Sequence, residues 1–93
     1  MIDFIYLADF KFSNLTIKKF LIIEKTKYYF KTIDINGQII YFSNVLDEIA
    51  FTEINAIFNL LNSINKEIGL YPEYKSFLLH KQRIIEKYYK KLD

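Results

Sequence analysis

Apolar and polar residues alternate at the start of the chain. From Ile2 to Phe12 every even position is apolar, whereas Asp3, Asp9 and Lys11 occupy odd positions. A period of two is typical of a strand that buries one face. Three further segments rich in Ile, Phe and Tyr follow, and polar, turn-like residues separate them. The pattern therefore predicts four strands, at about 2–12, 16–24, 27–35 and 38–43.

The connections between these strands are short enough for hairpins. Asn36-Gly37 is a strong hairpin signal, because a type I′ turn needs positive φ at both central residues. Ser13-Asn14 and Lys25-Thr26 are candidates for the other two-residue turns. With these turns, the numbers of directly opposite residues add up to 27, 51 and 73 in the three successive hairpins. A slip of one residue in any hairpin would exchange the faces of a strand.

This register divides the strand side chains between two faces of one sheet. The face expected under the helices collects Phe4, Tyr6, Ala8, Phe10, Ile17, Leu21, Ile23, Tyr28, Phe30, Ile39 and Tyr41, with Lys19, Thr32 and Asp34 as its polar members. The other face carries most of the strand charges, yet it is also rich in large apolar residues. Two helices cannot cover both faces, so we expect this face to stay open and to bind a partner. Its predicted partner-binding residues are Ile5, Leu7, Phe20, Ile22, Tyr29, Ile40 and Phe42, with Ile33 beside them.

After Ser43 the apolar period lengthens to three and four residues, which predicts one helix from about 45 to 68 and a second from about 72 to 92. Ser43 or Asn44 is expected to cap the first helix, with Asp47 and Glu48 near the positive end of its dipole. We expect Gly69 to end it in a left-handed conformation, and Pro72 to fit the first turn of the second helix. The short connection between the helices makes them antiparallel neighbours.

The predicted fold class follows from this order of elements. It is α+β: a four-stranded antiparallel meander followed by an antiparallel helical hairpin that packs on one sheet face. A chain of 93 residues allows one core, so residues 1–93 are expected to form a single domain. We find no internal repeat, low-complexity segment or linker.

Composition removes several classes of function. The chain has no Cys, a single His, one Arg and two Gly, so it lacks the parts of a disulfide scaffold, a thiolate or His-rich metal site, and a Gly-rich phosphate loop. No set of nucleophile, base and oxyanion donors can be assembled from the remaining residues. We therefore predict a protein without cofactor or metal, and not an enzyme.

The location that we expect is the cytoplasm. Apolar runs are far shorter than the roughly 20 residues that span a bilayer, and no basic segment precedes an apolar one at the N-terminus. The predictions are therefore no membrane contact and no secretory signal. The absence of cysteine suits a reducing compartment.

The net charge of +2 is unevenly distributed. Residues 47–69 are acidic and residues 70–93 are basic. On the second helix, Arg83, Lys87 and Lys90 fall within about 60° of one another, and we call these three residues the basic stripe. The stripe could contact acids of a partner protein or phosphates of a nucleic acid, and a solvated helix face with a Glu86–Lys90 pair is the structural alternative.

Three other polar residues are best explained without chemistry. No carboxylate stands three or four positions from His80, so we expect an ordinary surface or boundary histidine. Glu53 falls within the apolar arc of the first helix, and we expect its carboxylate to accept a hydrogen bond from Tyr88. Lys81 is expected to bury its stem and keep its ammonium in water.

The overall character of the chain resembles a known group of proteins. Twelve Lys against one Arg, and sixteen Ile against one Val, are typical of an AT-rich genome. In size, composition, lack of catalytic residues and spare apolar surface, the chain resembles the small inhibitors made by phages and mobile elements, anti-CRISPR proteins among them. The resemblance is one of general character over the whole chain, and no family residue is carried over. It implies a protein that blocks a host enzyme by occupying a working surface.

Two hypotheses of function follow. The leading one is a non-enzymatic protein-binding inhibitor or adaptor that uses the open sheet face, with the basic stripe as a polar rim. Its partner would be a host protein, for example a nucleic-acid-processing defence enzyme. A second copy of the chain, bound through the same face as a homodimer, is the simpler alternative. The alternative is a small nucleic-acid-binding regulator in which the basic stripe meets phosphates.

Overall fold

The computed structural model describes residues 3–11 and 14–92. It contains strands β1 (Phe4–Lys11), β2 (Asn14–Lys25), β3 (Tyr29–Ile33) and β4 (Ile39–Ser43), followed by helix α1 (Glu53–Leu70), a short 3₁₀ turn η1 (Pro72–Tyr74) and helix α2 (Lys75–Leu92). The strands form one antiparallel sheet in the order β1-β2-β3-β4. The predicted α+β class with four strands followed by two helices is confirmed. Ile2, Phe12 and Ser13, which the sequence assigned to the first strand and its turn, lie outside the described residues.

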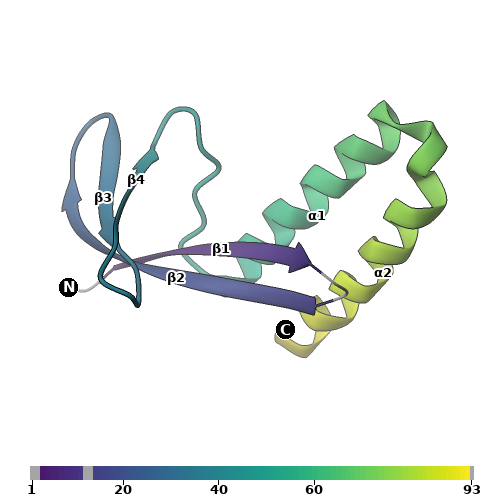
Figure 1. Ribbon diagram of the computed structural model, residues 1–93, viewed down its shortest axis with the longest axis horizontal. Coiled ribbons are helices and arrows are strands. Elements are labelled where there is room, and N and C mark those ends of the chain that lie inside the picture. Colours follow the sequence, from purple (N-terminus) through teal and green to yellow (C-terminus); the bar gives the residue numbers. More distant parts are fainter. Residues whose placement is uncertain (1–2, 12–13, 93) are drawn as a thin grey trace.

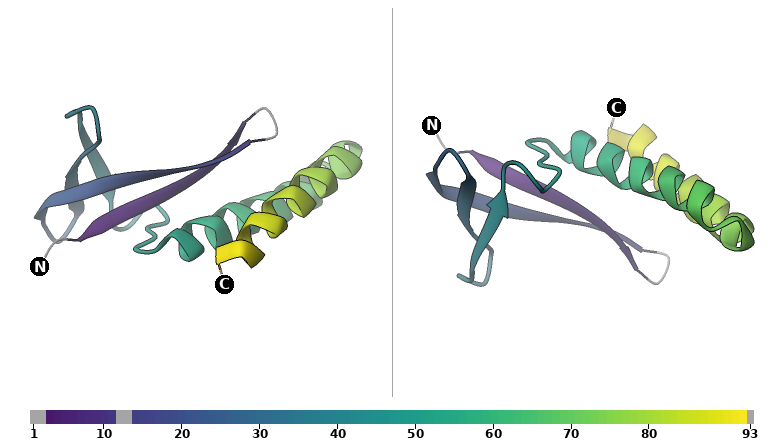
Figure 2. Two further views of the ribbon diagram at one scale, coloured as in Figure 1. Left: turned by 90° about the horizontal axis from the view of Figure 1, so that it is seen from below. Right: turned by 90° about the horizontal axis from the view of Figure 1, so that it is seen from above.

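The sheet is strongly curled. Figure 2 shows β1 and β2 as a long ribbon, with the two helices on one side of it and the β3–β4 hairpin on the other. Figure 1 shows the same division along the length of the molecule, with the connection between α1 and α2 at the end farthest from β3 and β4. Each side of the β1–β2 ribbon therefore buries its own set of side chains.

The helical side follows the predicted face in β1 and β2. Ile57, Ile64, Leu78 and Ile85 form the buried cluster between the helices, and the strand residues packed against it are Ala8, Phe10, Leu15 and Ile17. The β1–β2 register pairs Phe4 with Leu21 and Ala8 with Ile17, two positions away from the predicted pairing. A shift of two residues keeps every side chain on its face. For this reason the helix-facing residues of β1 were predicted correctly.

The predicted registers of the other two hairpins are wrong. Ile22 lies opposite Thr32 rather than Tyr29, and a bulge between Ile22 and Glu24 shifts the rest of the pairing. Phe30 lies opposite Phe42, one position from the prediction. These shifts move β3 to the other face, so that Thr32 and Phe30 now share a face with Ile22 and Phe42. β4 keeps its predicted face, because the two errors cancel there.

The turn between β3 and β4 explains the second error. Gly37 has φ 81°, as the Asn36-Gly37 signal predicts, but the loop spans three residues rather than two. The Gly37 N–H donates to the Asp34 carbonyl at 3.1 Å, and the Asp34 N–H donates to the Gln38 carbonyl at 3.0 Å. This is the pattern of a turn followed by a left-handed bulge residue. The Asp34 carboxylate supports it by accepting from the N–H groups of Asn36 and Gln38, each at 2.9 Å.

Helix α1 begins eight residues later than predicted, at Glu53 rather than 45. Thr52 is its N-cap and accepts from the Asn55 N–H at 3.1 Å. Ser43, predicted as a cap, instead accepts from the N–H groups of Val45 and Leu46 within the loop that precedes α1. This loop returns to the outer edge of β1, where the Ala50 carbonyl accepts from the Tyr6 N–H at 2.9 Å. Apolar spacing at 45–52 therefore reflects a loop, and not a helical turn.

The end of α1 also differs from the prediction. The helix runs to Leu70 and Tyr71 is its C-cap, so Gly69 lies within the helix and not at positive φ. Pro72 begins η1, which leads directly into α2, as expected for proline in a first turn. Between the helices, the Gln82 amide donates to the Asn65 amide oxygen.

Candidate partner-binding surfaces

The predicted open sheet face is largely a second core. Ile5 is 1% exposed and Phe20 is 4% exposed, and the Phe20 ring packs edge-on against Phe42 with centroids 5.2 Å apart. Thr32, on the same face, is fully buried and donates from its hydroxyl to the Ile40 carbonyl at 2.8 Å. The expectation that Ile5 and Phe20 are exposed is wrong, because the curl of the sheet folds β3 and β4 over them. They are unavailable to a partner while the chain is folded.

The remaining residues predicted on that face have separate surroundings. Leu7 is exposed, whereas Ile22, Ile40 and Phe42 are half-buried along the curl. Tyr29 lies on the opposite face of β3, where its ring meets that of Tyr41 at 5.4 Å. The structure therefore does not gather the seven apolar residues into one surface.

The basic stripe is where the sequence places it. Arg83, Lys87 and Lys90 are all exposed on α2. Within the described residues, no carboxylate comes within 4.0 Å of their charged groups, so the Glu86–Lys90 pair of the structural alternative is not formed. The stripe presents three cations to solvent, free for acids of a partner or for phosphates.

The other polar candidates also have clear positions. His80 is exposed on α2, as expected. The expected hydrogen bond between Glu53 and Tyr88 is not formed: Glu53 lies exposed in the first turn of α1, and Tyr88 is exposed on α2. Lys81 is half-buried with its ammonium 5.7 Å from the centre of the Phe10 ring. At the start of the sheet, a 2.7 Å contact with the Lys25 ammonium holds the pKa of Asp3 below its usual value.

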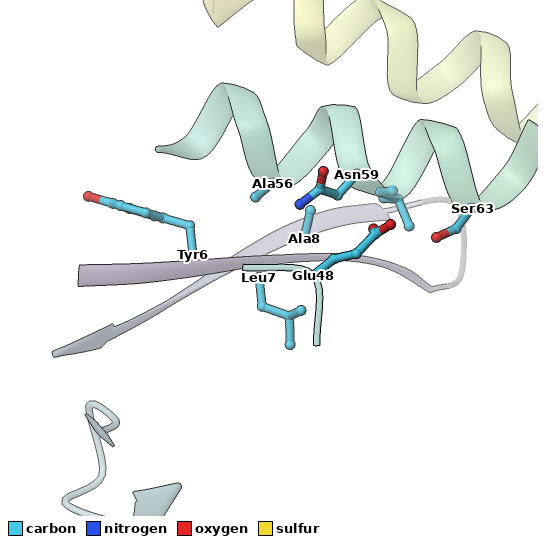
Figure 3. Close-up of a pocket in the computed structure, with 8 residues that line it drawn as sticks. Tyr6, Leu7, Ala8, Glu48, Ala56, Asn59 and Ser63 are labelled. Carbon is cyan, nitrogen blue, oxygen red and sulfur yellow. The ribbon is translucent and has the colours of Figure 1, made fainter. Parts of the chain in front are cut away.

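Figure 3 shows a small pocket between the outer edge of β1 and α1. Asn59 and Ser63 of α1 and Glu48 of the preceding loop bring an amide, a hydroxyl and a carboxylate to it, and the phenol of Tyr6 points away. Its volume is about 130 Å³. Ligand pockets usually measure about 300–1,000 Å³, so this one has room for a few water molecules and not for an organic substrate.

A larger groove of about 420 Å³ runs between β2 and the β3–β4 turn. Its charged members are Lys18, Lys19 and Asp34. The Asp34 carboxylate is already occupied by two backbone N–H groups of the turn. The groove has the volume of a small-molecule site, but with the Asp34 carboxylate occupied it offers no pair of groups for acid–base chemistry. Nor does any cluster of three or more His, Cys, Asp or Glu in the described part of the chain form a metal site.

The apolar surface that sequence reasoning missed is at the far end of the helical hairpin. Leu70, Tyr71, Tyr74 and Phe77 surround the connection between α1 and α2, and their exposed fractions are 71%, 50%, 59% and 67%. We call these four residues the hairpin tip. In Figures 1 and 2 the tip extends well past the end of the β1–β2 ribbon. No strand covers it there.

The hairpin tip continues the buried seam of the helices. Tyr71 is the C-cap of α1, seven residues after the buried Ile64, and Tyr74 ends η1, four residues before the buried Leu78. Apolar side chains thus continue along the helical hairpin beyond the end of the sheet. The helical period of these residues was visible in the sequence, but the offset between the helices and the sheet was not.

Comparisons with protein-family models, with curated protein sequences and with solved structures gave no match. In the described part of the chain, neither helix has the length and apolar character needed to cross a membrane.

Proposed function

We propose that this protein is a non-enzymatic inhibitor or adaptor that binds a partner protein through the hairpin tip. The observation that carries the proposal is the exposure of four large apolar side chains where the helical seam outruns the sheet. Large exposed apolar patches usually mark interaction sites, and tyrosine is enriched among the residues that dominate binding energy.

Burial of the hairpin tip would supply about as much free energy as association costs, so a stable complex needs further contacts around the tip. If each of the four side chains loses about 100 Å² to a partner, burial at about 25 cal/mol/Å² contributes about 2.5 kcal/mol each. The total of about 10 kcal/mol is of the same order as the cost of association. The hairpin tip alone would therefore bind weakly, and further contacts are required for a stable complex.

The basic stripe is the natural source of those contacts. It lies on α2, the helix that contains Phe77 and that Tyr74 directly precedes, and its three cations form no ion pair within 4.0 Å among the described residues. Around the tip itself Lys66, Glu67, Glu73 and Lys75 balance one another. A partner with an apolar cleft beside an acidic surface would match both features, with the charges acting mainly on the association rate.

The kind of partner that we propose is a host protein. Small size and a composition typical of an AT-rich genome support a phage or mobile-element inhibitor that acts in the host cytoplasm and occupies a working surface of a defence enzyme. Inhibition by occupation needs no catalytic group on the inhibitor.

The test compares two matched variants in partner capture. Tyr74→Ser combined with Phe77→Ser removes the centre of the tip, and Phe58→Ser removes a similarly exposed aromatic residue of α1 outside it. A partner retained from the lysate of an AT-rich host should be lost with the tip variant, and affinity for the purified partner should fall at least about tenfold, or about 1.4 kcal/mol. Equal binding by the tip variant and the wild type would refute the proposal.

Nucleic-acid binding remains the second candidate, favoured by the unpaired basic stripe. Reversal of Arg83, Lys87 and Lys90 to Glu should then abolish binding to DNA or RNA, and affinity should fall steeply with salt. Protein binding through the tip rests mainly on apolar burial, with the basic stripe only at its rim, so its affinity should fall much less steeply with salt. The two functions are distinguished by the salt dependence of whichever complex is found.

A further inference from the structure

The outer edge of β4 carries backbone groups without partners. The Asp34 N–H donates to Gln38, and the Asn44 N–H donates to Tyr28, so even-numbered residues along β4 face β3. In an antiparallel ladder the intervening residues face the other way. The N–H and C=O groups of Ile39, Tyr41 and Ser43 therefore point to the outer edge, because β4 is the last strand of the sheet.

One end of this edge is closed by the chain itself. The Ser43 N–H donates to the Asp47 carboxylate at 2.7 Å, and the Asp47 N–H donates to the Ser43 carbonyl at 3.2 Å. Within the described residues, Ile39 and Tyr41 have no such neighbour on the outer side. The residues whose outward backbone groups stay unpaired are thus Ile39 and Tyr41, one on each side of Ile40.

Three of the usual protections of an edge strand are missing from β4. Natural edge strands carry charges, proline or a bulge that prevent pairing with another chain. Residues 38–43 contain no charged residue and no proline, and the β3–β4 pairing has no bulge. An edge of this kind is a template for a further strand.

Exposed apolar residues stand at both ends of β4. Ile35, in the turn before β4, is 96% exposed, while Val45 and Leu46, in the loop after it, are 75% and 86% exposed. These are the three highest values among the large hydrophobic residues of the described chain. Figure 1 shows the turn and the loop at opposite ends of the strand.

We propose that two copies of this chain pair through β4, antiparallel, with the twofold axis at Ile40. In this register Ile39 lies opposite the partner's Tyr41, and the reverse pair completes four backbone hydrogen bonds. Antiparallel pairing also brings the start of one β4 to the end of the other. Ile35 of one copy and the partner's Val45 and Leu46 therefore come to the same end of the interface.

The choice of a second copy, and not a foreign strand, follows from this symmetry. The two open residues are related by the axis, so the edge supplies the donors and acceptors that it needs. Ile39 and the partner's Tyr41 form an apolar cross-strand pair, which stabilises antiparallel strands. A foreign strand would have to provide separate apolar residues for Ile35 at one end and for Val45 and Leu46 at the other.

Acidic residues at the two ends of β4 determine how the stability of the dimer depends on salt. Asp34 and the partner's Asp47 come to the same end of the paired strands, although each carboxylate accepts backbone N–H groups of its own copy. Their mutual repulsion is weakened by salt. The dimer should therefore persist or strengthen as ionic strength rises.

The first test is the mass in solution. Light scattering at about 100 µM should give twice the protomer mass of 11.2 kDa. Ile39→Pro removes an outward N–H without touching the β3–β4 ladder, and should give a folded monomer. The tip variant Tyr74→Ser/Phe77→Ser should remain dimeric, which separates this inference from the proposed function. A monomeric wild type, or a dimer that survives Ile39→Pro, would overturn the proposal.

The second test is a cross-link that reports the register. The chain has no cysteine. Residue 40 would face its own counterpart as a non-hydrogen-bonded pair, with Cα atoms about 4.5 Å apart, which is within disulfide range. Ile40→Cys should therefore oxidise to a covalent dimer, and Ile39→Cys, two positions from its counterpart, should not. If Ile40→Cys does not fold, Ile39→Cys/Tyr41→Cys should cross-link instead. Cross-linking of Ile39→Cys alone would contradict the register.

Discussion

Replacing Phe20 with alanine should destabilise the protein far more than an equivalent change on the helices. Phe20 is 4% exposed and packs edge-on against Phe42 at 5.2 Å. Removing a buried Phe side chain costs about 3–5 kcal/mol, which includes the aromatic pair of about 0.5–1.5 kcal/mol. A chain of this length is stable by about 5–14 kcal/mol in total, so the change removes a large share.

The assay is thermal and urea unfolding followed by circular dichroism. For a domain of this size each kcal/mol lowers Tm by about 4–8 °C, so Phe20→Ala should lower it by at least about 12 °C. Phe58→Ala, on the exposed side of α1, is the matched control and should lower it by only a few degrees. An unchanged Tm for Phe20→Ala would mean that the curl of β3 and β4 over Phe20 is wrong, and that the sheet face is open after all.

Three further predictions concern local structure. Gly37→Val should lower the free energy of unfolding in urea by about 1–2 kcal/mol, because a β-branched residue is strained at a φ of 81° even though a Cβ there meets no atom within 4 Å. Gly69→Ala, inside α1, should instead be neutral or stabilising. Thr52→Ala should cost about 0.5–2 kcal/mol through loss of the α1 cap, with partial loss of helical protection in hydrogen exchange, whereas Ser43→Ala should leave α1 protection unchanged. The carboxyl pKa of Asp3, measured by NMR, should lie below 3.8 and should rise in Lys25→Gln. Because folding lowers this pKa, the contribution of Asp3 to stability is fully present above pH 3.8 and is lost as the pH falls through the pKa of the folded state.

Sequence reasoning succeeded where an error in register did no harm. The predicted pairing of β1 with β2 is two residues off, and a shift of two keeps Ala8 and Ile17 under the helices. It failed at β3, because the bulge between Ile22 and Glu24 has no signal in the residues that form it. One odd shift was enough to exchange Tyr29 and Thr32 between faces.

The two candidate surfaces likewise differ in whether the sequence could predict them. The basic stripe depends only on spacing within one helix, so it could be predicted. The hairpin tip depends on where α1 begins along β1, which the loop from Asn44 to Thr52 determines. In that loop Leu46 and Ala50 follow a helical spacing by chance, while the true cap at Thr52 has no glutamate three positions later to complete a capping box. Local patterns therefore predicted the elements, and the offset between them required the structure.

The most direct test of the proposed function is amide hydrogen exchange of this protein alone and in complex with its captured partner. Binding through the hairpin tip predicts new protection over residues 66–80, with weaker protection along α2 where the basic stripe meets the rim of the partner. Protection confined to residues 83–91, or to the strands with residues 66–80 unchanged, would contradict the account.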